Sequence, residues 1–437
     1  MFDQDVYLNK YNKLRCIYKY YIDSFLALYK LKTESEEELK SIYKMIKTEL
    51  IDSNKYPPKN IIKDILNIIP YNNRYAMSYL SLTKLFYDEY HVEQVNNLIS
   101  PSNTLFYKEY EIKLDKSSDS GNNYIKNLDI HTENTIYRAI MNNDKERFIC
   151  FTERDGFDKN EILESSLYPY SKEGYSLLEL CCYHGAVDCF KLLRTKFNSE
   201  ITKKCLQFSF LGGNPEIMSE CLKYQKSDDD CMEYAIISHN IDFVTFLMNE
   251  YKIKIDLDIC GFYNNLEAFL VYFNQTNDTN KCFVYSPIFN IPSLCEYFLS
   301  HGMKINGKDK DGKTALHTAA FRNCKETAEL LISRGAKINE QDDYGEIALH
   351  KAAWNSSIET AEVLIAHGAN INKKDKYGQT PLHFAVYCFC KEFAELLISH
   401  GANVNERMNI GDTALYTATY LNDLEMAELL ISHGAKK

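Results

Sequence analysis

A period of 33 residues runs through the last third of the chain and constrains its fold more than any other feature. Two sets of glycines and one set of leucines recur at this spacing. The recurring residues are Gly312, Gly345, Gly378 and Gly411, then Leu316, Leu349, Leu382 and Leu415, and then Gly335, Gly368, Gly401 and Gly434. A fixed period of this length is typical of a solenoid, in which each unit buries its apolar side chains only by packing on its neighbours.

Each unit is predicted to form a turn followed by two short helices. Gly312 suits a turn conformation that a side chain would disfavour. Thr314 is expected to cap the first helix, because its hydroxyl group accepts a hydrogen bond from a free main-chain N–H. In this unit the helices are expected over about 315–322 and 326–334, and Gly335 ends the second one. A stack of such helix pairs is an all-α solenoid.

The start of each first helix carries a motif with the same period. The motif reads Thr314-Ala315-Leu316-His317, Ile347-Ala348-Leu349-His350, Thr380-Pro381-Leu382-His383 and Thr413-Ala414-Leu415-Tyr416. Together with the period, it resembles the T-P-L-H-x-A core of ankyrin repeats over about 303–437. The resemblance implies four clear ankyrin repeats in an ankyrin-type α-solenoid, with short β-turn fingers joining the helix pairs.

The helix-pair rhythm continues upstream in degenerate form. Turns are expected at Asn142-Asn143, His184-Gly185, Gly212-Gly213-Asn214, His239-Asn240 and Asn264-Asn265, and near Asn290. We interpret residues 133–302 as degenerate ankyrin-like helix pairs that continue into the clear repeats. The alternative is a separate all-α domain.

The same segment carries a second resemblance. Runs such as SLLELCCYHGAVDCFKLL and CMEYAIISHNIDFVTFLMNEY resemble a domain of unknown function that precedes ankyrin repeats in large families of trichomonad-type protist proteins. This resemblance implies a cytosolic or host-interaction ankyrin protein, and it implies no particular chemistry.

Residues 1–113 predict an N-terminal α-helical region without repeats. Ser35-Glu36-Glu37-Glu38 predicts a capping box at the start of a helix to about Asp52, and Pro57-Pro58 precedes another helix to about Ile69. The polar stretch that follows, Asp115–Asn123, predicts a flexible linker within 114–132.

Composition limits the classes of partner and site. The net charge of −11, from 50 basic and 61 acidic residues, argues against nucleic acid or an anionic membrane as the main partner. The N-terminus lacks the features of a signal peptide, and no run of about 18 apolar residues spans a membrane, so a cytoplasmic location is expected. The 14 cysteines show no C-x-x-C spacing, and neither a metal nor a cofactor is expected.

Two motifs that suggest chemistry are better explained by the repeats. Residues 307–314 fit the P-loop pattern G-x-x-x-x-G-K-[ST], but they fall in register with the other turns, follow no predicted strand, and place Asp309 and Asp311 where a phosphate would be repelled. His317, His350 and His383 recur once per repeat, about 10 Å apart in a helical stack, which is too far for one metal ion. We expect these histidines to hydrogen-bond to main-chain or threonine groups between repeats, and we expect no enzyme activity.

An aromatic residue is predicted at the end of each first helix. These four residues, here named the aromatic stripe, are Phe321, Trp354, Tyr387 and Tyr420, and Trp354 is the only tryptophan of the chain. Tyr344 and Tyr377 precede the finger glycines. In ankyrin folds these positions line the concave face, so the stripe and the two finger tyrosines are the candidate partner-binding residues. The alternative is a ladder of rings that pack on one another and on the finger bases.

These features favour a non-enzymatic scaffold that binds a protein or peptide partner on the concave face. The alternative is an adaptor or inhibitor that recruits an enzyme through the N-terminal helical region, which requires an exposed apolar groove within 1–113. The last repeat keeps Leu429, Leu430 and Ile431 where terminal repeats carry polar side chains, so self-association through this repeat is a further expectation.

Overall fold

The structure is a computed structural model that describes residues 2–53, 56–92, 94–95, 98–115, 125–170 and 173–436. It divides into two compact units, residues 1–274 and 275–437. The structure is mostly helical, with 61% of the residues in helices, which confirms the predicted fold class.

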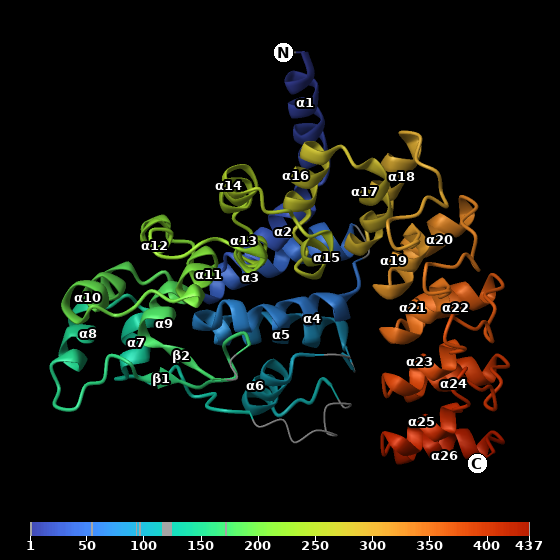
Figure 1. The fold of residues 1–437 in the computed structure, drawn as a ribbon. Helices are drawn as coiled ribbons and strands as arrows, with labels where there is room; N and C mark the ends of the chain where they lie inside the picture. The colour runs from blue at the N-terminus through green and yellow to red at the C-terminus, as the bar shows by residue number, and fades with distance from the viewer. Residues whose placement is uncertain are drawn as a thin grey trace. The chain divides into compact units, whose positions relative to one another are not determined.

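The second unit is a stack of helix pairs (Figure 1). Its elements are α17 (Thr279–Tyr285), η5 (Ser286–Phe289), α18 (Pro292–Ser300), α19 (Ala315–Phe321), α20 (Lys325–Ser333), α21 (Ala348–Trp354), α22 (Ile358–Ala366), α23 (Pro381–Tyr387), α24 (Lys391–Ser399), α25 (Ala414–Tyr420) and α26 (Leu424–Ser432). Each first helix from α19 to α25 contacts the first helix of the next pair. The predicted helix pairs of the clear repeats are therefore confirmed.

Main-chain hydrogen bonds join neighbouring fingers in this unit. The amides of Asp343, Lys376 and Asn409 donate to the carbonyl oxygens of the residues 32 positions earlier, at 2.9–3.0 Å. This close approach explains why a finger needs glycine. Gly378 has φ +78°, and a Cβ atom there would lie 2.7 Å from the main-chain nitrogen of Asn409.

The repeat histidines hydrogen-bond as predicted. In the first clear repeat, Nδ1 of His317 accepts from the main-chain N–H of Thr314 at 3.1 Å, and Nε2 faces the carbonyl oxygen of Glu346 in the next repeat at 3.1 Å. The Thr314 hydroxyl lies 2.9 Å from the same Nδ1 and can donate to it, so histidine and threonine bond to each other at the start of the helix. In the last clear repeat, where Tyr416 replaces histidine, the threonine hydroxyl accepts from the main chain, at 3.2 Å.

The first unit contains five further helix pairs between residues 136 and 276. Their helices are α7 (Ile136–Met141), α8 (Lys145–Thr152), α9 (Leu177–His184), α10 (Val187–Phe197), α11 (Lys203–Gly212), α12 (Pro215–Cys221), α13 (Asp229–Ile237), α14 (Ile241–Tyr251), α15 (Leu257–Phe262) and α16 (Leu266–Thr276). The connections within the pairs fall at the predicted turn residues. Two short antiparallel strands, β1 (Ile162–Leu163) and β2 (Tyr175–Ser176), precede α9.

The N-terminal part of the first unit is helical, as expected. Its elements are α1 (Phe2–Ile17), α2 (Lys19–Tyr29), α3 (Glu36–Ile46), the π-helical turn η1 (Lys47–Asp52), α4 (Pro58–Ile68), the 3₁₀ turns η2 (Ile69–Tyr71) and η3 (Asn73–Tyr75), α5 (Ala76–Tyr90) and α6 (Ser100–Tyr110). The predicted capping box at Ser35 is wrong in detail. The helix begins at Glu36, but the Ser35 side chain makes no capping hydrogen bond, and its main-chain N–H bonds instead to the hydroxyl of Thr33 at 3.0 Å.

The predicted linker is only partly described. Residues 116–124 lie outside the described residues. At its start Leu114 and Asp115 are buried, and the Asp115 carboxylate accepts from the main-chain N–H of Leu98 at 3.0 Å. At its end the main chain of Lys126 bonds to that of Ser166 at 2.9 Å. Among the described residues, no helix has the length and apolar character needed to cross a membrane.

Candidate functional site

The aromatic stripe lies at the ends of four first helices. Phe321 is the last residue of α19, and Trp354, Tyr387 and Tyr420 end α21, α23 and α25. All four side chains are exposed, by 37%, 54%, 40% and 78% in chain order. The repeat period therefore places four accessible aromatic side chains at equivalent positions of four consecutive repeats.

The rings of the stripe do not form a ladder with one another. Among the ring contacts of the described residues, none joins two members of the stripe. Trp354 alone has a neighbouring ring, since its centroid lies 5.8 Å from that of Phe384 at an angle of 66°. This contact supports one side of the indole and leaves more than half of the side chain exposed.

The turns that follow the stripe hold its main chain in place. The residue two positions after each stripe member has a positive φ, from 54° to 58°, at Asn323, Ser356, Phe389 and Asn422. The carbonyl oxygen of Phe321 accepts from the Asn355 side-chain amide of the next repeat at 2.6 Å, and that of Trp354 accepts from the Cys388 thiol at 3.1 Å. The ends of the first helices are thus tied to one another across repeats, which fixes the spacing of the stripe.

The finger tyrosines are also exposed. Tyr344 and Tyr377 have exposed fractions of 50% and 61%. A carboxylate orders each finger, because Asp342 accepts from the main-chain N–H of Tyr344 at 2.9 Å and Asp375 does the same for Tyr377 at 2.9 Å. The candidate partner-binding residues proposed from sequence are therefore all accessible, and their role in binding stays a prediction.

A buried charge cluster beneath the fingers was missed by the sequence reasoning. Lys351 lies 2.8 Å from a carboxylate oxygen of Asp342 and also pairs with Glu346, and none of the three side chains is more than 14% exposed. Burial raises the pKa of Glu346. Burial would also raise the pKa of Asp342, but the hydrogen bond and charge of Lys351, together with hydrogen bonds from the main-chain N–H groups of Glu346 and Tyr344, lower it. A signal existed in the sequence, since Lys351 occupies a position where the other clear repeats have threonine or phenylalanine.

Burial shifts the pKa values of three histidines and of one cysteine that lie within the repeats. Burial lowers the pKa of His317, His350 and His383 to about 4, and it raises the pKa of the Cys388 thiol to about 11. The P-loop-like segment is a finger, in which the buried Thr314 bonds to an imidazole rather than facing an open phosphate site. Within the described residues, no group of three or more His, Cys, Asp or Glu side chains is arranged to hold a metal ion.

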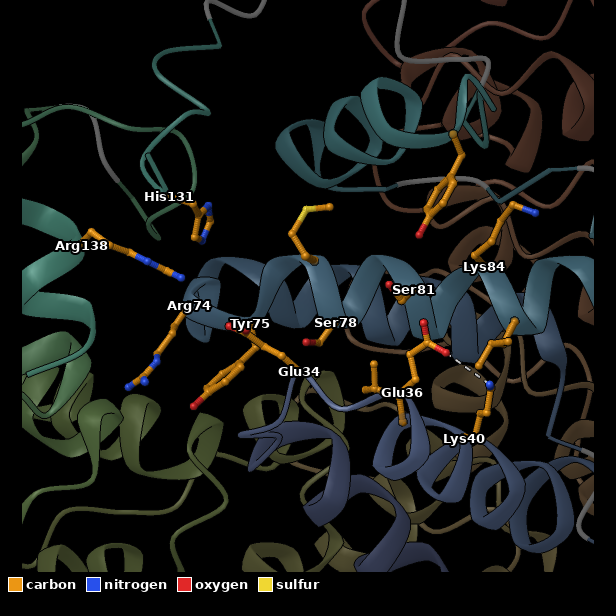
Figure 2. A pocket seen from close by; sticks show the side chains of 14 residues that line it. Glu34, Glu36, Lys40, Arg74, Tyr75, Ser78, Ser81, Lys84, His131 and Arg138 are labelled. Atoms are coloured by element: carbon orange, nitrogen blue, oxygen red, sulfur yellow. Dashed lines mark hydrogen bonds and ion pairs between the residues drawn. The ribbon is translucent and has the colours of Figure 1, made fainter. Parts of the chain in front are cut away.

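A separate cavity of about 550 Å³ lies along α5 in the first unit. Figure 2 shows Arg74, His131 and Arg138 at one end and Lys40 and Lys84 at the other. Its apolar lining comes from Leu39, Met77 and Leu85. Lys40 and Lys84 pair with acidic residues four positions away on their own helices, at 3.4 Å and 2.5 Å. The cavity combines an apolar floor with charged ends, because Glu34 and Glu36 also line it.

Comparison with known families agrees with the division into degenerate and clear helix pairs. Residues 266–342, 282–375 and 349–437 match the family described as ankyrin repeats (3 copies). Residues 197–272 match the domain of unknown function DUF3447. No curated protein matches the chain. Ankyrin repeats imply protein–protein interaction, and this chain carries a domain of unknown function followed by C-terminal ankyrin repeats.

Proposed function

We propose that residues 303–437 form a non-enzymatic scaffold that binds a partner protein through the aromatic stripe, with Tyr344 and Tyr377 at the edge of the contact. The observation that carries the proposal is the exposure of four aromatic side chains at one-repeat intervals, among them the only tryptophan. Aromatic residues contribute much of the energy of protein interfaces, because they bury large areas at a small cost in side-chain entropy.

The location and the domain limits belong to the same proposal. A cytoplasmic scaffold fits the match to ankyrin repeats, and the limits at residues 113, 133 and 302 stay predictions. The link to trichomonad-type protist proteins also stays a prediction.

A pull-down from cell lysate tests the scaffold. The full chain is compared with a variant that carries Phe321→Ala, Trp354→Ala, Tyr387→Ala and Tyr420→Ala, and with the control Tyr251→Ala, which truncates a tyrosine of similar exposure to Tyr387 in the first unit. All side chains that are changed are exposed, so circular dichroism should show the same helix content in the three proteins. A partner that both wild type and control capture, and that the stripe variant loses, supports the proposal. A partner retained by the folded stripe variant would refute it.

A second candidate function is an adaptor or inhibitor that recruits an enzyme through the N-terminal helical region. The cavity along α5 favours this candidate, because Met77 is 47% exposed beside the apolar floor. Met77→Glu would place a charge at this surface. The adaptor function predicts that this variant loses an enzyme that the stripe variant still captures, and an enzyme captured equally by both variants would argue against it.

Self-association through the last repeat is a separate part of the proposal. Of the three residues predicted from sequence, Ile431 is 49% exposed but Leu430 is buried, because it packs inside the repeat; Leu424 of α26 adds a side chain that is 68% exposed. Light scattering at high micromolar concentration should show dimers that Ile431→Glu removes. A monomer at all concentrations would exclude this contact.

A further inference from the structure

One turn residue recurs through both units and defines an internal alignment. In each helix pair a residue with positive φ lies shortly before the second helix. We name this set the turn row: Asn143, Gly185, Gly213, His239, Asn264, Asn290, Asn323, Ser356, Phe389 and Asn422. The main-chain bond that closes the turn is also shared, since Asn265 donates to Cys260 at 2.7 Å and Cys324 donates to Ala319 at 2.9 Å. The degenerate and clear repeats therefore present equivalent positions to a ligand.

The equivalent positions of the four clear repeats are exposed, whereas Ile288, at the equivalent position of the preceding pair in the second unit, is 7% exposed. The stripe residues lie two positions before the turn row. Their counterparts Tyr183 and Ile237 in the first unit are only 4% and 1% exposed, although Phe262 is exposed by 50%. In the turn row itself, His239 is 6% exposed. Something covers much of this surface in the first unit.

The chain's own N-terminal helices provide the cover. The hydroxyl of Tyr183 donates to the carbonyl oxygen of Pro70 at 2.8 Å and accepts from the main-chain N–H of Asn73 at 3.2 Å. The ring of His239 stacks on that of Tyr29, with centroids 4.1 Å apart. These contacts join residues of η2, η3 and α2 to the ends of α9 and α13.

The next pair is covered in the same way. The hydroxyl of Tyr21 in α2 donates to the side-chain oxygen of Asn264 at 2.9 Å. The hydroxyls of Tyr71 and Tyr263 lie 2.7 Å apart, and their rings meet edge to face. In the first unit, N-terminal helices of the same chain thus occupy the place that a ligand would take.

The spacing of two tyrosines along α2 is slightly longer than the spacing of the pairs. Tyr21 and Tyr29 are eight residues apart, which is about 12 Å along a helix. They meet Asn264 and His239, which belong to consecutive helix pairs, and packed helices lie about 8–10 Å apart. One helix therefore crosses the row and offers one side chain to each pair. A β-strand presents side chains on one face about every 6.8 Å, which is shorter than the interval between pairs.

We propose that the aromatic stripe binds an α-helix of a partner protein, which crosses the first helices and places a large apolar or aromatic side chain against each repeat at intervals of seven or eight residues. This inference rests on the proposed function and adds the class of partner. A polyproline II segment, with about 9.3 Å per three residues, also fits the spacing. The α-helix is favoured because α2 contacts the turn row of the first unit, two residues beyond the positions equivalent to the stripe.

The test uses three displayed peptide libraries of equal length against the full chain. One library has a stapled α-helical frame, one is proline-rich, and one forms β-hairpins. Selected peptides are synthesised and titrated by the emission of Trp354, the only tryptophan. We expect binders from the helical library, with large side chains seven or eight residues apart. Their affinity should fall at least tenfold for Tyr387→Ala and stay unchanged for Tyr251→Ala.

The other outcomes separate the two claims. Stripe-dependent binders that come only from the proline-rich or hairpin library would overturn the helical partner and leave the proposed function standing. Binders whose affinity is the same for wild type, for Tyr387→Ala and for Tyr420→Ala would overturn both. Because these side chains are 40% and 78% exposed, circular dichroism should confirm that both variants remain folded.

Discussion

The buried histidines of the repeats make the second unit sensitive to mild acid. His317, His350 and His383 are at most 2% exposed. In each, Nδ1 accepts a main-chain N–H from the residue three positions earlier, at 3.1 Å, so this nitrogen carries no proton. A charged imidazole would lose that bond within the core, and burial lowers the pKa of each to about 4.

The direction of the effect follows from the two pKa values. An unfolded histidine has a pKa of about 6.5, so between pH 6.5 and pH 4 the unfolded chain binds more protons than the folded one. Stability is complete above pH 6.5 and is lost as the pH falls towards 4. From pH 7 to pH 5 the loss is about 2 kcal/mol for each histidine that stays neutral in the fold.

Urea unfolding of the full chain, followed by Trp354 emission, measures this loss. His350→Gln is the informative variant, because glutamine at this helix position can still accept the capping bond and does not titrate. We expect it to remove about 2 kcal/mol of the difference in unfolding free energy between pH 7 and pH 5. His400→Gln changes an exposed histidine and should leave the difference intact.

The comparison of wild type with His350→Gln also cancels the contribution of other titrating groups to the pH dependence. Glu346, whose pKa is raised by burial, titrates in wild type and variant alike and cancels in the difference. An equal pH dependence in His350→Gln and wild type would refute the reasoning, since it would mean that His350 is not kept neutral by its site.

Three further changes test the packing. Lys351→Met leaves two buried carboxylates without their cation and should lower the free energy of unfolding by about 3 kcal/mol. The control Lys376→Met changes an exposed lysine and should alter this free energy little. Equal effects of the two substitutions would contradict the buried cluster. Tyr183→Phe leaves two buried main-chain groups unpaired in the first unit and should cost about 1–3 kcal/mol by thermal unfolding, and an unchanged Tm would show that these groups find other partners. Gly378→Ala forces a side chain against the main chain of Asn409 at positive φ, so it should destabilise the repeats by more than about 1 kcal/mol in urea, and a neutral result would contradict the close finger contact.

The sequence predicted the parts of the fold that repeat. The 33-residue period placed the helix pairs of the clear repeats, and turn residues such as Asn264 located the degenerate pairs, because glycine and asparagine tolerate the left-handed turn. The same period located the stripe. Local signals of this kind depend on residues a few positions apart, so a single sequence is enough to detect them.

The contacts that were missed are of another kind. Tyr21 meets Asn264 and Tyr29 meets His239 across more than 200 residues, and no periodicity links them. The capping box was predicted from Ser35 and the glutamates after it, but the main-chain N–H of Ser35 bonds to the hydroxyl of Thr33 instead. Such outcomes depend on which of several polar partners comes closest in three dimensions, and the sequence does not contain that information locally.

The most direct test of the account is a titration of the captured partner into the full chain, followed by Trp354 emission. We expect the emission of the wild type to shift in a saturable manner. A variant that keeps Trp354 and carries Phe321→Ala, Tyr387→Ala and Tyr420→Ala should bind at least tenfold more weakly. A partner that binds both proteins equally, with no change in Trp354 emission, would contradict the claim that the aromatic stripe is the binding surface.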